Sequence, residues 1–151
     1  MLGDPFNILI VEARADPALA DSLLAGAKGA LSKADARFDV VSVPGALEIP
    51  AVVAMAEEGG HRPAGVRYDG YVALGCVIHG ESLHYGIAVG EVARALNDLA
   101  IGRRLAIGNG VLAVDTAREA LAFAEAGAGG AAARACLTVV TLKRKLLGQA
   151  R

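Results

Sequence analysis

Short, continuous apolar runs alternate along the chain with longer stretches in which apolar residues recur every three or four positions. The runs predict strands at residues 7–14, 38–43, 71–78 and 105–112. The longer stretches predict helices at residues 16–35, 46–59, 81–100, 115–127 and 127–148. Apolar strands that alternate with helices are typical of a parallel sheet covered on both faces.

Residues with strong local preferences mark the ends of these elements. Asp16 is placed to cap the first helix, and Pro17 suits its first position. Asp115 is a candidate cap for the fourth helix. With right-handed crossovers, residues 1–151 are expected to form one α/β domain, a three-layer α/β/α sandwich around a four-stranded parallel sheet. Residues 1–6 are expected to be a flexible N-terminal segment.

Composition narrows the classes of partner. Hydrophobic residues make up 54% of the chain, yet no apolar run approaches the roughly 20 residues that cross a bilayer. The surplus of apolar side chains favours a homo-oligomer. The formal net charge is -1, and no dense cluster of Lys or Arg indicates a nucleic-acid groove. We therefore expect neither nucleic acid nor a membrane as a partner, and a cytoplasmic location, because the N-terminus lacks a basic secretory region.

Cysteine and histidine positions give little support for a metal site. Cys76 and Cys136 each lie in an apolar run and form no CxxC motif, so we interpret both as buried free thiols. His79 and His84 are five residues apart with no third ligand close by. No metal is expected.

The polar residues that directly follow the third strand are the first candidates for chemistry. Ligands of parallel sheets bind beyond the carboxyl ends of the strands. Gly80, Glu81 and Ser82 stand just before or at the start of a predicted helix, where backbone amides favour an anion such as phosphate. Ser82 acting only as a helix cap is an equally good interpretation. His84, in the first turn, is suited to proton transfer at neutral pH, although a lone loop histidine is more often structural.

Two further segments are expected at the same edge. A carboxylate at Glu48 suits ligand hydroxyls or amines, but it would also stabilise a helix N-terminus without any ligand. The glycines that flank Asn109, at the end of the fourth strand, would let a ligand approach the backbone closely. The wider GxGxxG dinucleotide pattern is missing.

Three blocks, in this order and separation, resemble the lumazine synthase family of riboflavin biosynthesis. They are VPGALEIP at residues 43–50, ALGCVIHGESLHY at residues 73–85 and GNGVLAVDTAREAL at residues 108–121. The likeness extends from about Ile8 to Lys145 and implies a flavodoxin-like sandwich that assembles as pentamers, some of which pack into 60-subunit shells. It also implies a transferase without a cofactor, which condenses 5-amino-6-(D-ribitylamino)uracil with 3,4-dihydroxy-2-butanone 4-phosphate, releases phosphate and closes the ring to 6,7-dimethyl-8-ribityllumazine.

The resemblance assigns roles residue by residue. His84 matches the family's proton-transfer histidine, and Glu81 and Ser82 match the positions that hold the phosphate. The other matched positions form the ribityl-binding turn, the strand end along the pyrimidine ring and the part of the pocket supplied by the adjoining subunit: Ala46, Leu47 and Glu48; Cys76, Val77 and Ile78; and Asn109.

The departures from the family pattern fall in the pocket. Ala15 stands where the family usually stacks an aromatic ring on the pyrimidine, and His79 replaces an arginine. Phe123 aligns with a phosphate-binding arginine, and the turn at residues 126–130 is short. We expect binding to suffer more than the fold, and a shell-forming or flavin-binding paralogue with weak or no catalysis is the alternative. The short turn modestly favours the shell over a free pentamer.

Overall fold

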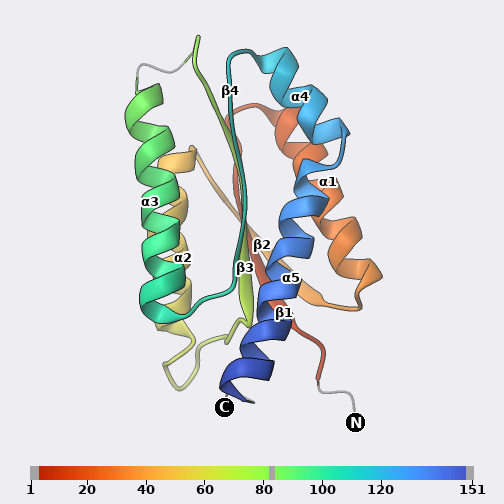
Figure 1. The fold of residues 1–151 in the computed structure, drawn as a ribbon, viewed down its shortest axis with the longest axis vertical. Coiled ribbons are helices and arrows are strands. Elements are labelled where there is room, and N and C mark those ends of the chain that lie inside the picture. Colours follow the sequence, from red (N-terminus) through yellow and green to blue (C-terminus); the bar gives the residue numbers. More distant parts are fainter. Residues whose placement is uncertain (1–3, 82–83, 149–151) are drawn as a thin grey trace.

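A four-stranded parallel sheet forms the centre of the molecule (Figure 1). The computed structural model describes residues 4–81 and 84–148. The strand order is β2-β1-β3-β4. The strands are β1 (Asn7–Ala13), β2 (Arg37–Val43), β3 (Gly70–Ile78) and β4 (Ile107–Val114).

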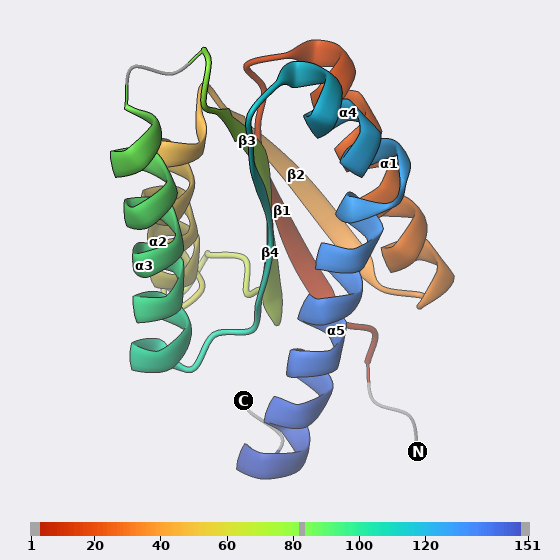
Figure 2. The same ribbon diagram turned by 45° about the horizontal axis from the view of Figure 1, so that its top comes forward.

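Helices cover both faces of the sheet, as Figures 1 and 2 show. On one face lie α1 (Pro17–Lys33), α4 (Ala117–Glu125) and α5 (Ala128–Leu147); on the other lie α2 (Ile49–Gly59), after a 3₁₀ turn η1 (Ala46–Glu48), and α3 (Tyr85–Arg103). The expected three-layer α/β/α sandwich is therefore confirmed. Within the described residues, no helix combines the length and the apolar character needed to cross a membrane.

The central strands are buried on both faces. In β1, Ile8 and Ile10 pack toward α1 and α5, whereas Leu9 and Val11 pack toward α2 and α3. A strand buried on both sides has no solvent face, which is why its sequence is a continuous apolar run. This double burial is the signal that the sequence carried for a parallel sheet.

Helix caps confirm one predicted boundary and correct another. The Asp16 carboxylate accepts a hydrogen bond from the Leu19 amide at 3.2 Å and caps α1. Asp115 was expected to cap α4, but it does not. Thr116 does, because its hydroxyl accepts a hydrogen bond from the Glu119 amide at 3.1 Å. Both neighbours have capping side chains, so spacing alone could not choose between them.

The described part of the N-terminal segment makes defined contacts. The Phe6 carbonyl accepts a hydrogen bond from the Arg37 amide at 2.8 Å. The Arg144 guanidinium lies 4.3 Å from the centre of the Phe6 ring. Residues 1–3 lie outside the described residues.

Glycines at the start of β4 allow α5 to approach the sheet at backbone distance. A Cβ atom at Gly108 would lie 1.9 Å from the Ala132 carbonyl oxygen, and one at Gly110 would lie 2.9 Å from the Ala132 side chain. The same helix packs against α1, where a Cβ atom at Gly129 would lie 2.0 Å from the Leu23 carbonyl oxygen. The glycines that flank Asn109 therefore make room for α5, not for a ligand as expected from the sequence.

We predict that Gly108→Ala lowers the free energy of unfolding by about 1–3 kcal/mol, because the added methyl group forces α5 away from β4. Gly29→Ala is the matched control. Gly29 lies in α1 with open space around its Cα, so alanine there should raise stability by roughly 0.5–1 kcal/mol through helix propensity. Urea unfolding measures both, and a Gly108→Ala protein as stable as wild type would contradict the packing described here.

Candidate functional site

A cavity of about 610 Å³ opens beyond the carboxyl ends of β1 and β3. The chain leaves these neighbouring strands in opposite directions, with α1 on one face of the sheet and α3 on the other (Figure 2). Such a switch point leaves a crevice between the two connections, which is the usual ligand position in a parallel sheet. A volume of this size is typical of a small-molecule site.

Most of the residues singled out from the sequence line this cavity. They come from the loop after β1, the η1 turn, the end of β3 and the segment before α3: Ala15, Ala46, Leu47, Glu48, Cys76, Val77, Ile78, Glu81 and His84. The topology thus brings together segments that are far apart in the sequence.

Two of the proposed residues that the structure describes, Asn109 and Phe123, are not among those that line the cavity. Asn109 lies near the start of β4, opposite Ala73 of β3, and not at the end of the strand as expected. Its side-chain oxygen accepts a hydrogen bond from the Val111 amide at 2.9 Å. Phe123 lies on α4 with 52% of its surface exposed. Ser82 lies outside the described residues.

The sequence did not identify the wall that α1 contributes. Leu19, Ala20 and Leu23 line the cavity together with Pro17. The helical spacing of Leu19 and Leu23 agrees with their burial on one face of α1, but a spacing pattern does not distinguish a side chain in the core from one at the rim of a cavity. Beside this wall, Ala15 adds a methyl group to the lining.

The Glu48 carboxylate has a local structural role. It accepts a hydrogen bond from the Gly45 amide at 2.9 Å, while the Glu48 amide donates to the Gly45 carbonyl at 3.2 Å. These two bonds close the η1 turn and agree with the interpretation of Glu48 as a helix-start carboxylate. Because Glu48 also lines the cavity, the turn holds a carboxylate at its wall.

His84 precedes α3 instead of lying in its first turn. The helix begins at Tyr85, so the expected start at Glu81 is wrong. The Glu81 amide donates to the Ile78 carbonyl at 3.1 Å in a turn that continues from β3. The His84 carbonyl accepts the first helical bond, from the Ala88 amide at 2.7 Å, and its side chain lines the cavity. An imidazole at this place is within the cavity wall and suited to proton transfer.

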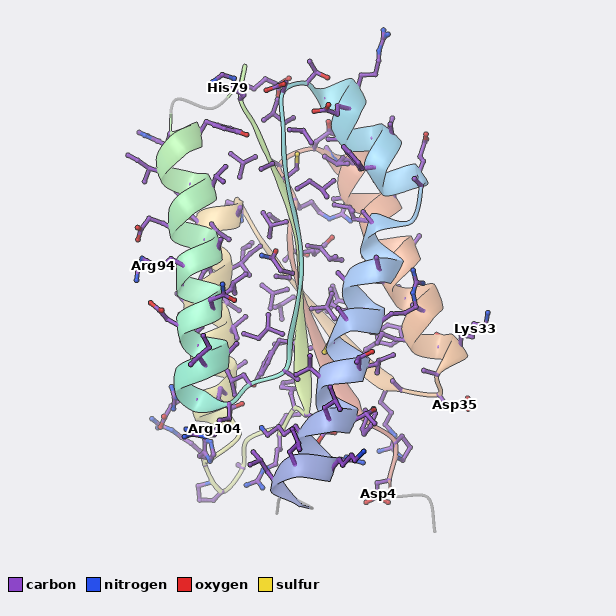
Figure 3. The ribbon with its side chains drawn as sticks, viewed as in Figure 1. Asp4, Lys33, Asp35, His79, Arg94 and Arg104 are labelled. Carbon is purple, nitrogen blue, oxygen red and sulfur yellow. The ribbon has the colours of Figure 1, made fainter. Side chains whose placement is uncertain are left out.

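His79 occupies a different environment. It lies at the outer tip of the carboxyl edge, beyond the end of β3 (Figure 3). Its Nδ1 is 3.6 Å from an Asp115 carboxylate oxygen, and its ring centre is 4.7 Å from that of Tyr85. His79 is not among the residues that line the cavity. These contacts favour a structural role at the surface.

The charge of the cavity wall is predominantly negative. Among the described lining residues, Asp16, Glu48 and Glu81 carry carboxylates, and His84 is the one side chain that can become positive. Arg14, next to the lining residue Ala15, donates its hydrogen bonds to the Glu12 and Asp21 carboxylates, which do not line the cavity. Within the described residues, no three His, Cys, Asp or Glu side chains are grouped as a metal would require.

Cys76 contributes a neutral thiol to the wall. Burial raises its pKa to about 11, and the negative charges of Glu81 and Asp16 add to this effect. Burial likewise raises the pKa of Cys136 to about 12. Both cysteines are free thiols, as expected, but only Cys136 is fully buried, whereas Cys76 is half-buried at the cavity wall. The Cys76 side chain therefore presents an uncharged surface to a ligand at neutral pH.

The raised pKa predicts slow alkylation of Cys76. Because the thiolate is the reactive form, the rate with iodoacetamide should rise about tenfold per pH unit from pH 7 to pH 9.5 without a plateau. Mass spectrometry of the modified peptide measures this rate. Cys76→Ala supplies the background from Cys136. A rate that levels off between pH 8.5 and pH 9.5, as for an ordinary thiol with a pKa near 8.5, would contradict the assigned environment.

Comparisons with known proteins agree on one family. The family model of 6,7-dimethyl-8-ribityllumazine synthase matches residues 5–144. The 6,7-dimethyl-8-ribityllumazine synthase 1 of Rhizobium meliloti is 53% identical over 145 residues, which cover 94% of this chain and 94% of the relative. The 6,7-dimethyl-8-ribityllumazine synthase of Agrobacterium fabrum is 52% identical over 145 residues, with 94% and 97% covered. That of Methylobacterium radiotolerans is 55% identical over 141 residues, with 91% and 82% covered.

Proposed function

The chain belongs to the 6,7-dimethyl-8-ribityllumazine synthase family, and we propose that it catalyses the reaction of that family in riboflavin biosynthesis. In this reaction 5-amino-6-(D-ribitylamino)uracil condenses with 3,4-dihydroxy-2-butanone 4-phosphate, and the products are 6,7-dimethyl-8-ribityllumazine, phosphate and water. The main support for this proposal is that His84, the η1 turn and the end of β3 line one common cavity.

The chemistry of this reaction needs proton transfer more than it needs a metal or a cofactor. Condensation of an amine with a carbonyl forms a C=N bond and expels water, which requires protons to move at nitrogen and oxygen. Loss of the phosphate as an anion requires removal of a proton from carbon. An imidazole titrates near neutral pH and can serve in both directions. His84 is placed in the cavity wall for this role.

The two substrates are proposed to occupy opposite ends of the cavity. The ribityl chain lies along Ala46, Leu47 and Glu48, whose carboxylate accepts hydrogen bonds from hydroxyl groups. The pyrimidine ring lies between the end of β3, at Cys76–Ile78, and the loop that contains Ala15. The phosphate end of the butanone lies toward Glu81, with Ser82 as a further proposed contact.

Two observations support the paralogue with weak or no catalysis as a second candidate. The described cavity wall carries three carboxylates and no Lys or Arg, which disfavours a phosphate ester through like-charge repulsion. Ala15 also offers no ring for stacking, an interaction worth about 1 kcal/mol. Mixing the purified protein with both substrates and recording lumazine fluorescence distinguishes an enzyme from such a paralogue, because the paralogue would release little product.

We predict that His84→Ala lowers turnover roughly ten- to a thousandfold, because water replaces only part of the proton transfer. His79→Ala is the matched control and should keep most of the activity, since His79 lies outside the cavity. Steady-state rates with both substrates saturating measure the two variants. Equal losses at both positions would mean that the proton-transfer residue is wrongly assigned.

We also propose that the chain works as a homo-oligomer, with a pentamer as the smallest active unit and a 60-subunit shell as a larger form. Large apolar side chains remain exposed on several helices, among them Met55, Ile87, Ile101 and Phe123. Asn109 and Phe123 do not line the cavity of their own chain. An adjoining copy that supplies them would complete the pocket. A cytoplasmic location is proposed as well, because charged substrates cross membranes poorly.

Shared pockets predict that activity and assembly disappear together. On dilution, specific activity should fall in the same concentration range in which the particle mass drops below five chains, since a separated chain has an incomplete site. Mass photometry and product fluorescence on the same samples provide the two readouts. A stable and fully active monomer would contradict the shared site, and particles of about five chains alone would rule out the shell.

A further inference from the structure

Glu12 is a buried carboxylate for which the proposed reaction gives no role. It lies in β1 on the same face as Ile8 and Ile10, where the alternation of the strand predicts another apolar residue. With 3% of its surface exposed, it is the one charged or polar side chain that is buried from solvent within the described parts of the chain. A carboxylate taken out of water must be compensated by partners.

Two neighbouring side chains compensate the Glu12 carboxylate. Arg14 donates from Nε to Oε2 at 2.9 Å and from Nη2 to Oε1 at 3.2 Å, which forms a bidentate pair. The Ser42 hydroxyl donates a further hydrogen bond to Oε2. Arg14 Nη2 also donates to the Asp21 carboxylate at 2.8 Å. The hydrogen bonds with Glu12 and then with Asp21 raise the pKa of the Arg14 guanidinium.

This network joins the three elements that surround one end of the cavity. Glu12 and Arg14 lie at the end of β1, Ser42 lies opposite Glu12 in β2, and Asp21 belongs to α1. The Arg14 amide continues the ladder by donating to the Val43 carbonyl at 2.9 Å. Directly after these strand ends, the chain continues into two segments that line the cavity. One contains Ala15, and the other starts at Gly45.

Stability alone gives a weak reason for this arrangement. Burial removes the Glu12 carboxylate from water, and this cost offsets much of its attraction to Arg14, whose side chain remains 31% exposed. A planar fork that binds a carboxylate at two points does, however, fix the direction of both side chains. The network is therefore better suited to fixing the positions of two loops relative to each other than to adding stability.

We propose that Glu12 is a positioning residue for the uracil substrate: through Arg14 and Ser42 it fixes the loop that begins at Ala15 against the turn that begins at Gly45. The inference rests on the proposed function, which places the ribityl chain and the pyrimidine ring along these two segments. Glu81 and His84 line the cavity from a different segment, between β3 and α3, which supplies none of the residues that form the network. Loosening it should therefore affect one substrate and not the other.

The test is Glu12→Gln, which keeps the shape of the side chain but turns an amide donor toward the donors of Arg14. The Michaelis constant for the uracil substrate should rise about tenfold, since a displacement near 1 Å can cost up to a hundredfold. The constant for the butanone phosphate and the turnover number should stay within about threefold of wild type. A variant that merely destabilised the fold would not separate the two substrates in this way.

Two companion variants keep the test decisive. Ser42→Ala removes the link to β2 and leaves the pair with Arg14, so it should raise the same constant by a smaller factor; it serves as the primary variant if Glu12→Gln does not fold. Glu91→Gln is the matched control, because Glu91 also accepts two hydrogen bonds from an arginine, Arg94. Arg94 lies on the outer side of α3 (Figure 3). It should leave both constants unchanged.

Hydrogen exchange separates a failure of this inference from a failure of the proposed function. In Glu12→Gln, peptides that cover residues 14–18 and 43–48 should exchange faster, whereas those from α5 should not. If wild type forms no lumazine, the proposed function fails, and the exchange result still decides whether Glu12 holds the loops. An active wild type whose Glu12→Gln and Ser42→Ala variants keep both Michaelis constants, or unchanged exchange in both segments, overturns the positioning role.

Discussion

Coverage of the sheet on both faces is the constraint on which the other features depend. Parallel strands need a crossover after each strand, and helices on both sides bury every strand of the interior. All strands therefore end at the same edge, and β1 and β3, whose crossovers diverge, leave a crevice there. Side chains from segments far apart in the sequence meet at this edge because each of them directly follows the end of a parallel strand.

The fold was predictable because its signals are local or periodic. A strand buried on both faces is continuously apolar, and a cap such as Asp16 acts within one turn. The errors occurred where neighbouring residues compete for the same position. Asp115 and Thr116 both have capping side chains, and the turn after β3 delays α3 until Tyr85. Asn109 was expected at the end of β4, where its flanking glycines would admit a ligand, whereas it lies near the start of the strand and the glycines accommodate α5.

The cavity was predictable to the extent that its residues follow directly after strands. Glu48 and His84 could be placed at one edge from the order of the elements alone, whereas the place of Cys76 in the pocket came from the resemblance to the family. The contribution of Leu23 could not, because helical spacing indicates burial but not what lies against the buried face. Glu12 was not identified for a related reason. The sequence shows a single carboxylate in an apolar run, and its bonds with Arg14 and Ser42 become visible only once the pairing of β1 with β2 is known.

The hydrogen bond between the Asn109 side chain and the Val111 amide has a consequence for solubility. β4 is an outer strand, bonded to β3 on one side, and an unprotected outer strand is a template for edge-to-edge aggregation. The amide of Val111 is already occupied by a side chain of its own strand, so a foreign strand cannot bond to it without first displacing Asn109. In a chain this rich in apolar residues, one backbone donor on the outer edge of β4 is thereby withheld from pairing with another strand.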